Sequence, residues 1–117
     1  MKVTVKNSIV KSSSLAWKPL VEKGILYQGV YVKSLKYDEK AKRSPSILLK
    51  FEAGASYPYH NHPGGEDIFV LKGSCKVNDE HMGAGDFLHT PVHCKHGVSS
   101  AKGCELLLNI PQEVEIL

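Results

Sequence analysis

Short runs of β-branched and aromatic residues alternate with breaks that contain Gly, Pro, Asn or Asp along most of the chain. Such runs predict strands over residues 25–37, 46–52, 57–62, 67–72, 74–77, 87–90 and 105–110, with a further one around Val98. Turns are expected at 63–65, at Gly73, at 78–80 and at 83–86. No stretch has the 3.6-residue periodicity of a core helix. The pattern predicts an all-β sandwich or barrel.

The first twenty residues are weakly patterned. Val3–Val5 is a candidate edge strand, and the segment from Trp17 to Leu20 is expected to cover the mouth of the barrel. We therefore expect residues 1–24 to form an N-terminal extension or edge strand and residues 25–117 to form the barrel domain. The 117 residues suit one domain, which is large enough to bury a core.

Composition and charge exclude several classes of protein. Hydrophobic residues make up 42% of the chain and charged residues 23%, which is typical of a globular protein. The net charge of +3 is small and the basic residues are scattered, so nucleic-acid binding is not expected. No apolar run is long enough to span a membrane, and the N-terminus lacks the apolar core of a signal peptide. We expect a soluble, cytoplasmic protein that does not bind membranes.

The histidines are the most informative side chains. All six lie between His60 and His96. In an extended segment His60 and His62 share one face, Glu66 follows after the turn Pro63–Gly65, and His96 can arrive from a neighbouring strand. Three nitrogen donors and one oxygen donor favour Zn, Fe, Mn, Ni or Cu over Ca or Mg. Four ligands complete a tetrahedral zinc site but leave two positions open on an octahedral ion.

This spacing resembles the two motifs of the cupins. The first motif, G-x5-H-x-H-x3-4-E-x6-G, is matched at every fixed position by GASYPYHNHPGGEDIFVLKG, residues 54–73. The second motif, G-x5-P-x-G-x2-H-x3-N, is matched at Gly85, Pro91 and His96. His93 stands where the family usually has Gly, and Ser100 where it usually has Asn. The resemblance implies a double-stranded β-helix, or jelly-roll barrel, with a metal held by His60, His62, Glu66 and His96.

A narrower resemblance is to the ChrR-like cupins, which include the zinc-binding domain of anti-sigma factors and small acetophenone- and diketone-cleaving dioxygenases. It is carried by HPGGE at residues 62–66, by DEH at residues 79–81, and by Gly103-Cys104. The helical domain with which the anti-sigma factors bind a sigma factor has no counterpart in the first twenty residues. The resemblance also implies a homodimer, with the N-terminal strand as a candidate for exchange between the two copies.

Other polar residues have simpler interpretations. His93 is interpreted as a turn residue near the mouth, with support of the metal site as the alternative. His81 and His89 are interpreted as surface residues or as residues that support the metal ligands, with a cavity-lining role as a further alternative for His89. Tyr57 and Tyr59 have the opposite parity to the histidines, so packing is expected of them. Asp67 is expected to be solvated. Ser100 is interpreted either as lining the cavity or as a structural hydroxyl.

The three cysteines, Cys75, Cys94 and Cys104, match no Cys-rich zinc motif. We expect reduced, partly buried thiols, although the sequence also allows a disulfide between Cys94 and Cys104.

Three functions fit these residues. The first is a metal-dependent dioxygenase with Fe(II), acting on a small diketone- or hydroxyketone-like molecule, with Glu66 as both ligand and catalytic base. The second is a non-catalytic zinc sensor, and the third is a cupin that binds a sugar or an acid. No further acid–base pair can be placed in the cavity from the sequence. This absence weakens the case for a hydrolase or an isomerase. It does not weaken the case for an oxygenase, in which the metal and O2 would carry the chemistry, so the oxygenase is favoured.

Overall fold

The fold is known from a computed structural model, which describes residues 3–117. Ten strands account for most of these residues: β1 (Lys18–Glu22), β2 (Ile25–Asp38), β3 (Arg43–Phe51), β4 (Ser56–His62), β5 (Glu66–Val77), β6 (Glu80–Gly83), β7 (Phe87–Thr90), β8 (Cys94–Ser99), β9 (Cys104–Asn109) and β10 (Glu115–Ile116). The only helices among the described residues are two 3-10 turns, Lys6–Ser8 and Ser12–Ser14. The predicted all-β class is confirmed.

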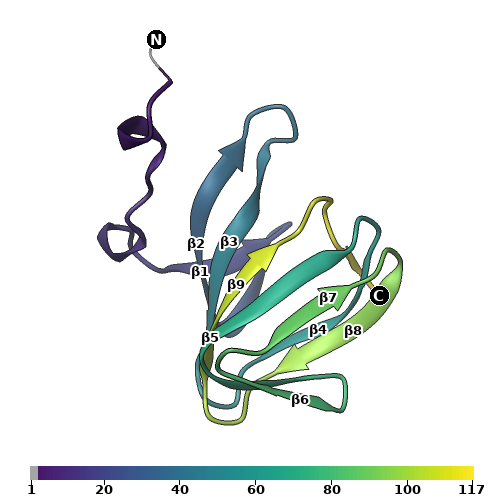
Figure 1. The fold of residues 1–117 in the computed structure, drawn as a ribbon. Coiled ribbons are helices and arrows are strands. Elements are labelled where there is room, and N and C mark those ends of the chain that lie inside the picture. The colour runs from purple at the N-terminus through teal and green to yellow at the C-terminus, as the bar shows by residue number, and fades with distance from the viewer. Residues whose placement is uncertain (1–2) are drawn as a thin grey trace.

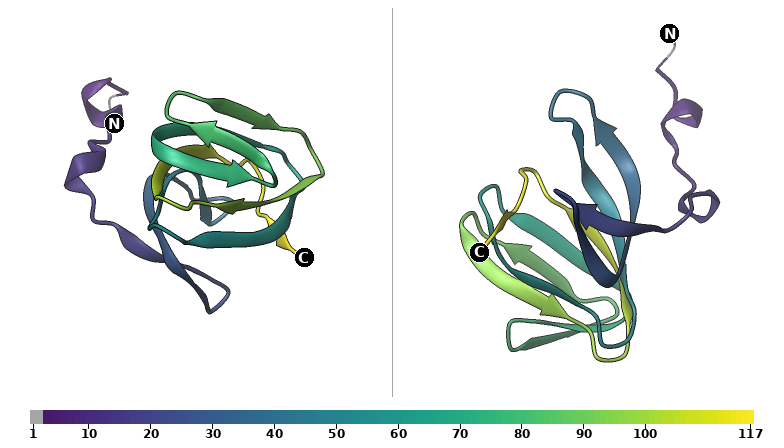
Figure 2. Two further views of the ribbon diagram at one scale, coloured as in Figure 1. Left: turned by 90° about the horizontal axis from the view of Figure 1, so that it is seen from below. Right: turned by 180° about the vertical axis from the view of Figure 1, so that it is seen from behind.

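The strands form two antiparallel sheets that curl toward each other (Figures 1 and 2). One sheet runs β1-β2-β3-β9-β5-β7, and the other runs β6-β5-β8-β4-β10. β5 is common to both sheets: its first part pairs with β7 and β9, and its last part pairs with β6 and β8. The strands between β3 and β9 therefore make the predicted jelly-roll barrel, with its interior between the two sheets.

Gly73 is the point at which β5 passes from one sheet to the other. The prediction of a turn there is wrong, because the strand continues from Glu66 to Val77. Gly73 has a φ of +72°, and a Cβ atom at this position would lie 2.2 Å from the carbonyl oxygen of Gly103. Only glycine fits this bend, so its role is to change the direction of a strand and not to end it.

The N-terminal segment differs from the prediction. Val3–Val5 forms no strand and is exposed, and the edge strand is β1 instead. Residues 3–17 extend away from the barrel (Figures 1 and 2). Trp17 anchors this segment through cation–π contacts with Lys33, 4.6 Å from the ring centroid, and Lys50, at 5.0 Å. No helix among residues 3–117 is long and apolar enough to cross a membrane.

The hydrophobic core fills the interior between the sheets. It is built from inward-facing residues of alternate positions, such as Ile68 and Val70 on β5, and Leu106 and Leu108 on β9, all at most 4% exposed. Phe51, on β3, is 2% exposed and belongs to the same cluster. Because side chains alternate across a strand, the residues between them face solvent. Core residues, among them Phe51 and Leu106, also line a small cavity together with buried polar side chains, which are described next.

Candidate metal centre

β4 carries two of the candidate ligands, and an irregularity in this strand sets their orientation. The register against β8 shifts between Tyr57, opposite Val98, and His60, opposite His96. From one pair to the next the chain advances three residues on β4 but only two on β8, so β4 contains one extra residue, which is a β-bulge. Pro58 lies within it, where a strand tolerates the missing backbone N–H. The bulge turns His60 and His62 toward the interior, where they are 2% and 0% exposed.

The other two candidate ligands come from neighbouring strands. His96 lies on β8 directly opposite His60. Glu66 begins β5, after a turn in which the Gly65 N–H donates to the His62 carbonyl over 3.1 Å. Gly65 has a φ of +77°, and a Cβ atom there would lie 2.9 Å from the Thr90 carbonyl oxygen. The turn thereby returns the chain so that Glu66, 4% exposed, faces the histidines.

The four side chains meet at one point. His62 Nε2 lies 2.8 Å from His60 Nε2 and 3.1 Å from His96 Nε2. Glu66 Oε1 lies 3.2 Å from His62 Nε2 and 3.1 Å from His96 Nε2. The structure therefore brings together every residue that the sequence predicted as a ligand, from three different strands.

Two pKa values reflect this burial. Burial lowers the pKa of His60 to about 4, against an opposing effect of its hydrogen bond to the Pro58 carbonyl. Burial alone would raise the pKa of Glu66, but its interactions with His62 and His96 outweigh this, so its pKa lies below the usual value. At neutral pH the site therefore presents a neutral His60 imidazole and a Glu66 carboxylate, the forms in which both groups bind metals.

The donor atoms suit a cation. The Nδ1–H of His60 donates to the Pro58 carbonyl over 2.6 Å, which leaves the lone pair of its Nε2 facing His62. Imidazole nitrogens at such separations need a proton or a cation between them. Glu66 Oε1 is also buried without an ordinary hydrogen-bond partner in the described part of the chain. His60, His62 and His96 could hold a metal ion.

Two positions at which the sequence departs from the cupin motif have structural explanations. His93 is an exposed turn residue with a φ of +66°, and its N–H donates to the His62 carbonyl over 2.8 Å. Glycine adopts this conformation without strain, whereas histidine adopts it only occasionally. The Ser100 hydroxyl donates to the Ser74 carbonyl over 2.6 Å and accepts from the Gly103 N–H over 2.9 Å. Of its two interpretations, the structural one is confirmed.

The remaining polar residues lie away from the centre. His89 is exposed and pairs with Asp67 over 2.7 Å on the outer face of the sheet. The cavity-lining alternative for His89 is therefore wrong. All three cysteines are free, as predicted, so the disulfide that the sequence allowed is not formed: Cys94 is exposed, whereas Cys75 and Cys104 are buried. The hydrogen bond between these two buried thiols lowers the pKa of Cys104 and raises that of Cys75.

Tyr57 is a neighbour of the site that the sequence did not identify. Its ring meets His60 edge-on, with 4.8 Å between the centroids, and its hydroxyl donates to Glu22 of β1. Strict alternation from His60 places Tyr57 on the opposite face, but the bulge reverses this. Pro58, which lies between Tyr57 and Tyr59, was the one sequence signal for a bulge.

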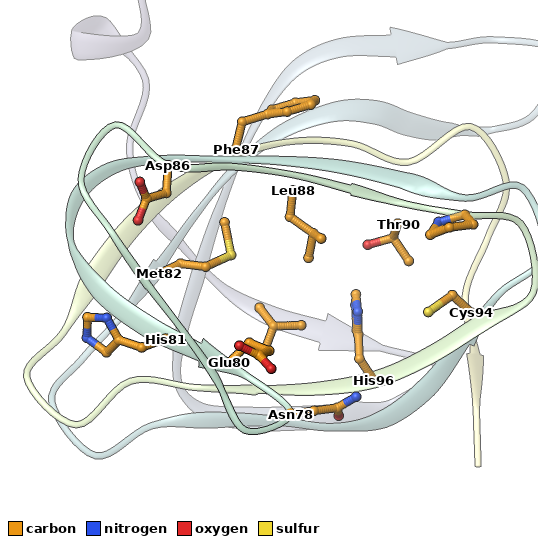
Figure 3. Close-up of a pocket in the computed structure, with 12 residues that line it drawn as sticks. Asn78, Glu80, His81, Met82, Asp86, Phe87, Leu88, Thr90, Cys94 and His96 are labelled. Carbon is orange, nitrogen blue, oxygen red and sulfur yellow. The ribbon is translucent and has the colours of Figure 1, made fainter.

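Two cavities adjoin the four side chains. A small one of about 50 Å³ is lined by His60, His62 and Glu66 together with core residues and Tyr57. A larger one of about 450 Å³, shown in Figure 3, is lined by His96 and by residues of β5, β6, β7 and β8. A small molecule in the larger cavity would therefore lie beside His96.

Comparisons with known proteins bear on the fold and on the family of this chain. No curated protein matches the chain. A solved structure from Methylibium petroleiphilum PM1, described as a candidate acetylacetone dioxygenase, has a TM-score of 0.81 at 18% identity, over 100% of this chain and 85% of that one. The structure of an acetylacetone dioxygenase from Acinetobacter johnsonii has a TM-score of 0.73 at 15% identity, over 100% of this chain and 76% of that one.

A third similar structure is the complex of Rhodobacter sphaeroides SigE with the anti-sigma ChrR. Its TM-score is 0.65 at 24% identity, over 84% of this chain and 49% of that one. At these identities the structures confirm the cupin fold. The family profile described as the ChrR Cupin-like domain matches residues 5–112, which is most of the chain. The protein is therefore a member of the ChrR Cupin-like family.

Proposed function

We propose that the protein is a metal-dependent dioxygenase that acts on a small diketone- or hydroxyketone-like substrate. One divalent transition metal, with iron favoured, is held by His60, His62, His96 and Glu66. Glu66 also serves as the catalytic base.

The spacing of the donor atoms is the observation that carries the proposal. Four donors at about 2.1 Å from an ion lie about 3.4 Å apart in a tetrahedron. Adjacent donors of an octahedron lie only about 3.0 Å apart. Three of the four separations, of 2.8, 3.1 and 3.1 Å, are nearer to the octahedral value, and the fourth, of 3.2 Å, is midway between the two values. Four protein donors on an octahedral ion leave two positions for a substrate.

The residues of the chain would contribute binding, orientation and proton transfer. A bound Fe(II) would supply the Lewis acidity and the redox chemistry with O2. The Pro58 carbonyl fixes the His60 ring, and the pairing of β4 with β8 fixes His96 opposite it. The Glu66 carboxylate, held ionised by its neighbours, can accept the acidic proton between two carbonyl groups. The apolar interior excludes bulk water from this step.

Similarity to the two structures described as acetylacetone dioxygenases supports this substrate class. The fold alone does not support a substrate class, because proteins of one fold have many different activities. The similarity to ChrR supports a second candidate, a non-catalytic zinc site. Zinc, with its preference for four ligands, would bind to the same side chains.

The test is O2 consumption by the iron-loaded protein with acetylacetone as substrate. We expect stoichiometric O2 uptake, and a loss of at least about 100-fold in Glu66→Gln, which removes the base. Asp67→Asn, which changes the next carboxylate on the outer face, is the matched control and should retain activity. Absence of O2 uptake in the iron-loaded protein with every diketone and hydroxyketone tried would contradict the proposal and favour the zinc site.

We also propose that the protein is a homodimer. Leu107, Phe69 and Phe87 form a row across β9, β5 and β7 and are 37–60% exposed on the outer face of the sheet. Contact with a second copy would cover this row. Light scattering at micromolar concentration should give twice the mass of 12.9 kDa, and a monomer would contradict the proposal.

A further inference from the structure

Cys75 and Cys104 are two buried thiols that the proposed function does not use. Cys104 begins β9 opposite Gly73 of β5, and Cys75 lies two residues further along β5. Cys75 is 2% exposed and Cys104 is 5% exposed, and both belong to the same core cluster. The Cys75 thiol donates a hydrogen bond to the sulfur of Cys104. Two nucleophilic groups from different strands are therefore in contact within the core.

The bend at Gly73 explains how the two side chains meet. A Cβ atom at Gly73 would lie 2.2 Å from the Gly103 carbonyl oxygen and 3.0 Å from the Cα atom of Cys104, so the two backbones approach very closely here. β5 then leaves β9 and pairs with β6, where Cys75 lies opposite Met82. Because Cys75 follows this close approach directly and is buried, its sulfur can reach that of Cys104.

The pair is separate from the candidate metal centre. Val77, two residues after Cys75, pairs with Val98, which lies two residues after His96. Side chains two residues apart share one face of a strand, so a layer of valine side chains lies between Cys75 and His96. A reaction at the thiols would therefore leave the four candidate ligands in place.

A cavity of about 390 Å³ has Cys75 among its lining residues. Its rim carries Lys76, His81 and Lys102, all exposed, and none of the described lining residues is Asp or Glu. Positive charge beside a cysteine favours the thiolate, which is the nucleophilic form. Because so little of Cys75 is exposed, only a small reagent can reach the pair from this cavity.

The hydrogen bond between the thiols distinguishes this pair from ordinary buried cysteines. A cysteine buried in apolar surroundings is usually inert, because burial disfavours its thiolate. Here the donation from Cys75 lowers the pKa of Cys104, although burial opposes this. Cys104 is therefore the thiol of the pair that ionises first, and Cys75 holds the proton next to it.

We propose that Cys75 and Cys104 form a redox site that hydrogen peroxide converts into an intramolecular disulfide. The Cys104 thiolate attacks one oxygen of the peroxide, the O–O bond breaks, and the departing hydroxide takes the Cys75 thiol proton and leaves as water. Cys75 then attacks the sulfenic acid on Cys104, the S–O bond breaks, and the second hydroxide takes a proton from solvent and leaves as water. In total, two thiols lose two electrons and two protons, and one peroxide is reduced to two water molecules.

The test uses the full-length protein loaded with zinc, which has no redox chemistry of its own. The native protein is treated with an excess of hydrogen peroxide, denatured, alkylated and digested with trypsin without reduction. Lysines separate the cysteines, so they fall on different peptides, residues 73–76, 77–95 and 103–117. We expect a disulfide between peptides 73–76 and 103–117, with the loss of two alkylatable thiols. Dithiothreitol should restore both thiols.

Two variants test the roles of the individual thiols. Cys75→Ala removes the hydrogen-bond donor, so we expect Cys104 to react with peroxide about tenfold or more slowly, and to stop at a sulfenic acid that dimedone traps. Cys94→Ala removes the exposed thiol of β8 and is the matched control. It should form the same disulfide at the wild-type rate. The wild-type digest alone decides the proposal if Cys75→Ala does not fold.

Three results would overturn the proposal. The first is that Cys75 and Cys104 both remain alkylatable after peroxide treatment of the native protein. The second is a disulfide that includes Cys94 in place of the expected one. The third is oxidation of Cys104 in Cys75→Ala at the wild-type rate, which would show that the hydrogen bond does not activate it. None of these readouts depends on O2 uptake, so they leave the proposed function to its own test.

Discussion

The hydrogen bond between Tyr57 and Glu22 joins the edge strand β1 to the wall of the candidate site, and its removal has a predictable pH dependence. Tyr57 is 8% exposed, and its hydroxyl donates to the Glu22 carboxyl group. Tyr57→Phe removes only this hydroxyl. A hydrogen bond to a charged group contributes about 1.5–3 kcal/mol. Glu22 is only half-buried, so water can replace the lost hydroxyl as its partner. We therefore expect Tyr57→Phe to lower the free energy of unfolding by about 1.5 kcal/mol, the lower end of this range.

The sign of the pH dependence follows from the raised pKa of Tyr57. Burial, followed by the hydrogen bond to Glu22, raises this pKa well above the ordinary value of 10.0. The hydroxyl therefore stays neutral in the folded protein while it ionises in the unfolded chain above pH 10. Its contribution to stability is present below pH 10 and decreases above it, by up to about 1.4 kcal/mol per pH unit. The stabilities of wild type and Tyr57→Phe should converge near pH 11.

Urea unfolding of the metal-free proteins between pH 7 and pH 11 checks this prediction. The other tyrosines are common to both proteins and cancel in the difference. A difference in the free energy of unfolding that stays constant from pH 7 to pH 11 would show that Tyr57 ionises equally in the folded and unfolded states. No difference at pH 7 would refute the stabilising role of the hydrogen bond.

Two further predictions concern the core and the thiols. Leu106→Ala should lower the free energy of unfolding by about 2–5 kcal/mol in urea titrations, because this side chain is 1% exposed in the core. Leu26→Ala, which changes a 56% exposed residue of β2, should cost less than half as much, and equal losses would contradict the inward and outward assignment. A thiol reagent should modify one cysteine of the native protein rapidly, Cys94, and all three after denaturation. Rapid modification of all three thiols in the native state would contradict the burial of Cys75 and Cys104.

The sequence predicted which side chains lie together at the candidate site, and for His60, His62 and Glu66 this was possible because the geometry is local. His60 and His62 are two residues apart on a strand, and the turn before Glu66 contains the glycine that its backbone needs. His96 was placed through the cupin motif, and the pairing of β4 with β8 puts it opposite His60. These relations depend on strand periodicity and turn chemistry, which short stretches of sequence determine.

Errors arose where a local signal has two structural outcomes. Gly73 was interpreted as a turn, but a glycine in a strand can also mark a bend between two sheets. Parity places Tyr57 opposite His60, but parity arguments fail across a bulge, and the packing expected of Tyr57 occurs on the inner face, beside His60. The packing expected of Tyr59 is wrong, because Tyr59 is 51% exposed. The apolar Val3–Val5 has the composition of a strand, yet it has no partner in the barrel, and the edge position is taken by Lys18–Glu22.

Some features carried little or no sequence signal. β6 and most of β8 are short or rich in polar residues, and their pairing with β5 and β4 decides their structure. Thr90 has no motif of its own. Its burial, at 1% exposed, and the lack of a hydrogen-bond partner for its hydroxyl among residues 3–117 depend on how β7 lies against β5. Such properties of tertiary packing become visible only in the assembled fold.

The most direct test of the metal centre is the metal content of the protein, purified without chelators and without nickel affinity resin. Elemental analysis should find about one transition metal ion per chain, and His62→Ala, which removes the fully buried candidate ligand, should lose it. His89→Ala, which changes an exposed histidine on the outer face, should retain the metal. Absence of any transition metal from the wild type, or equal metal content in His62→Ala and wild type, would contradict the assignment of His60, His62, Glu66 and His96 as a metal centre.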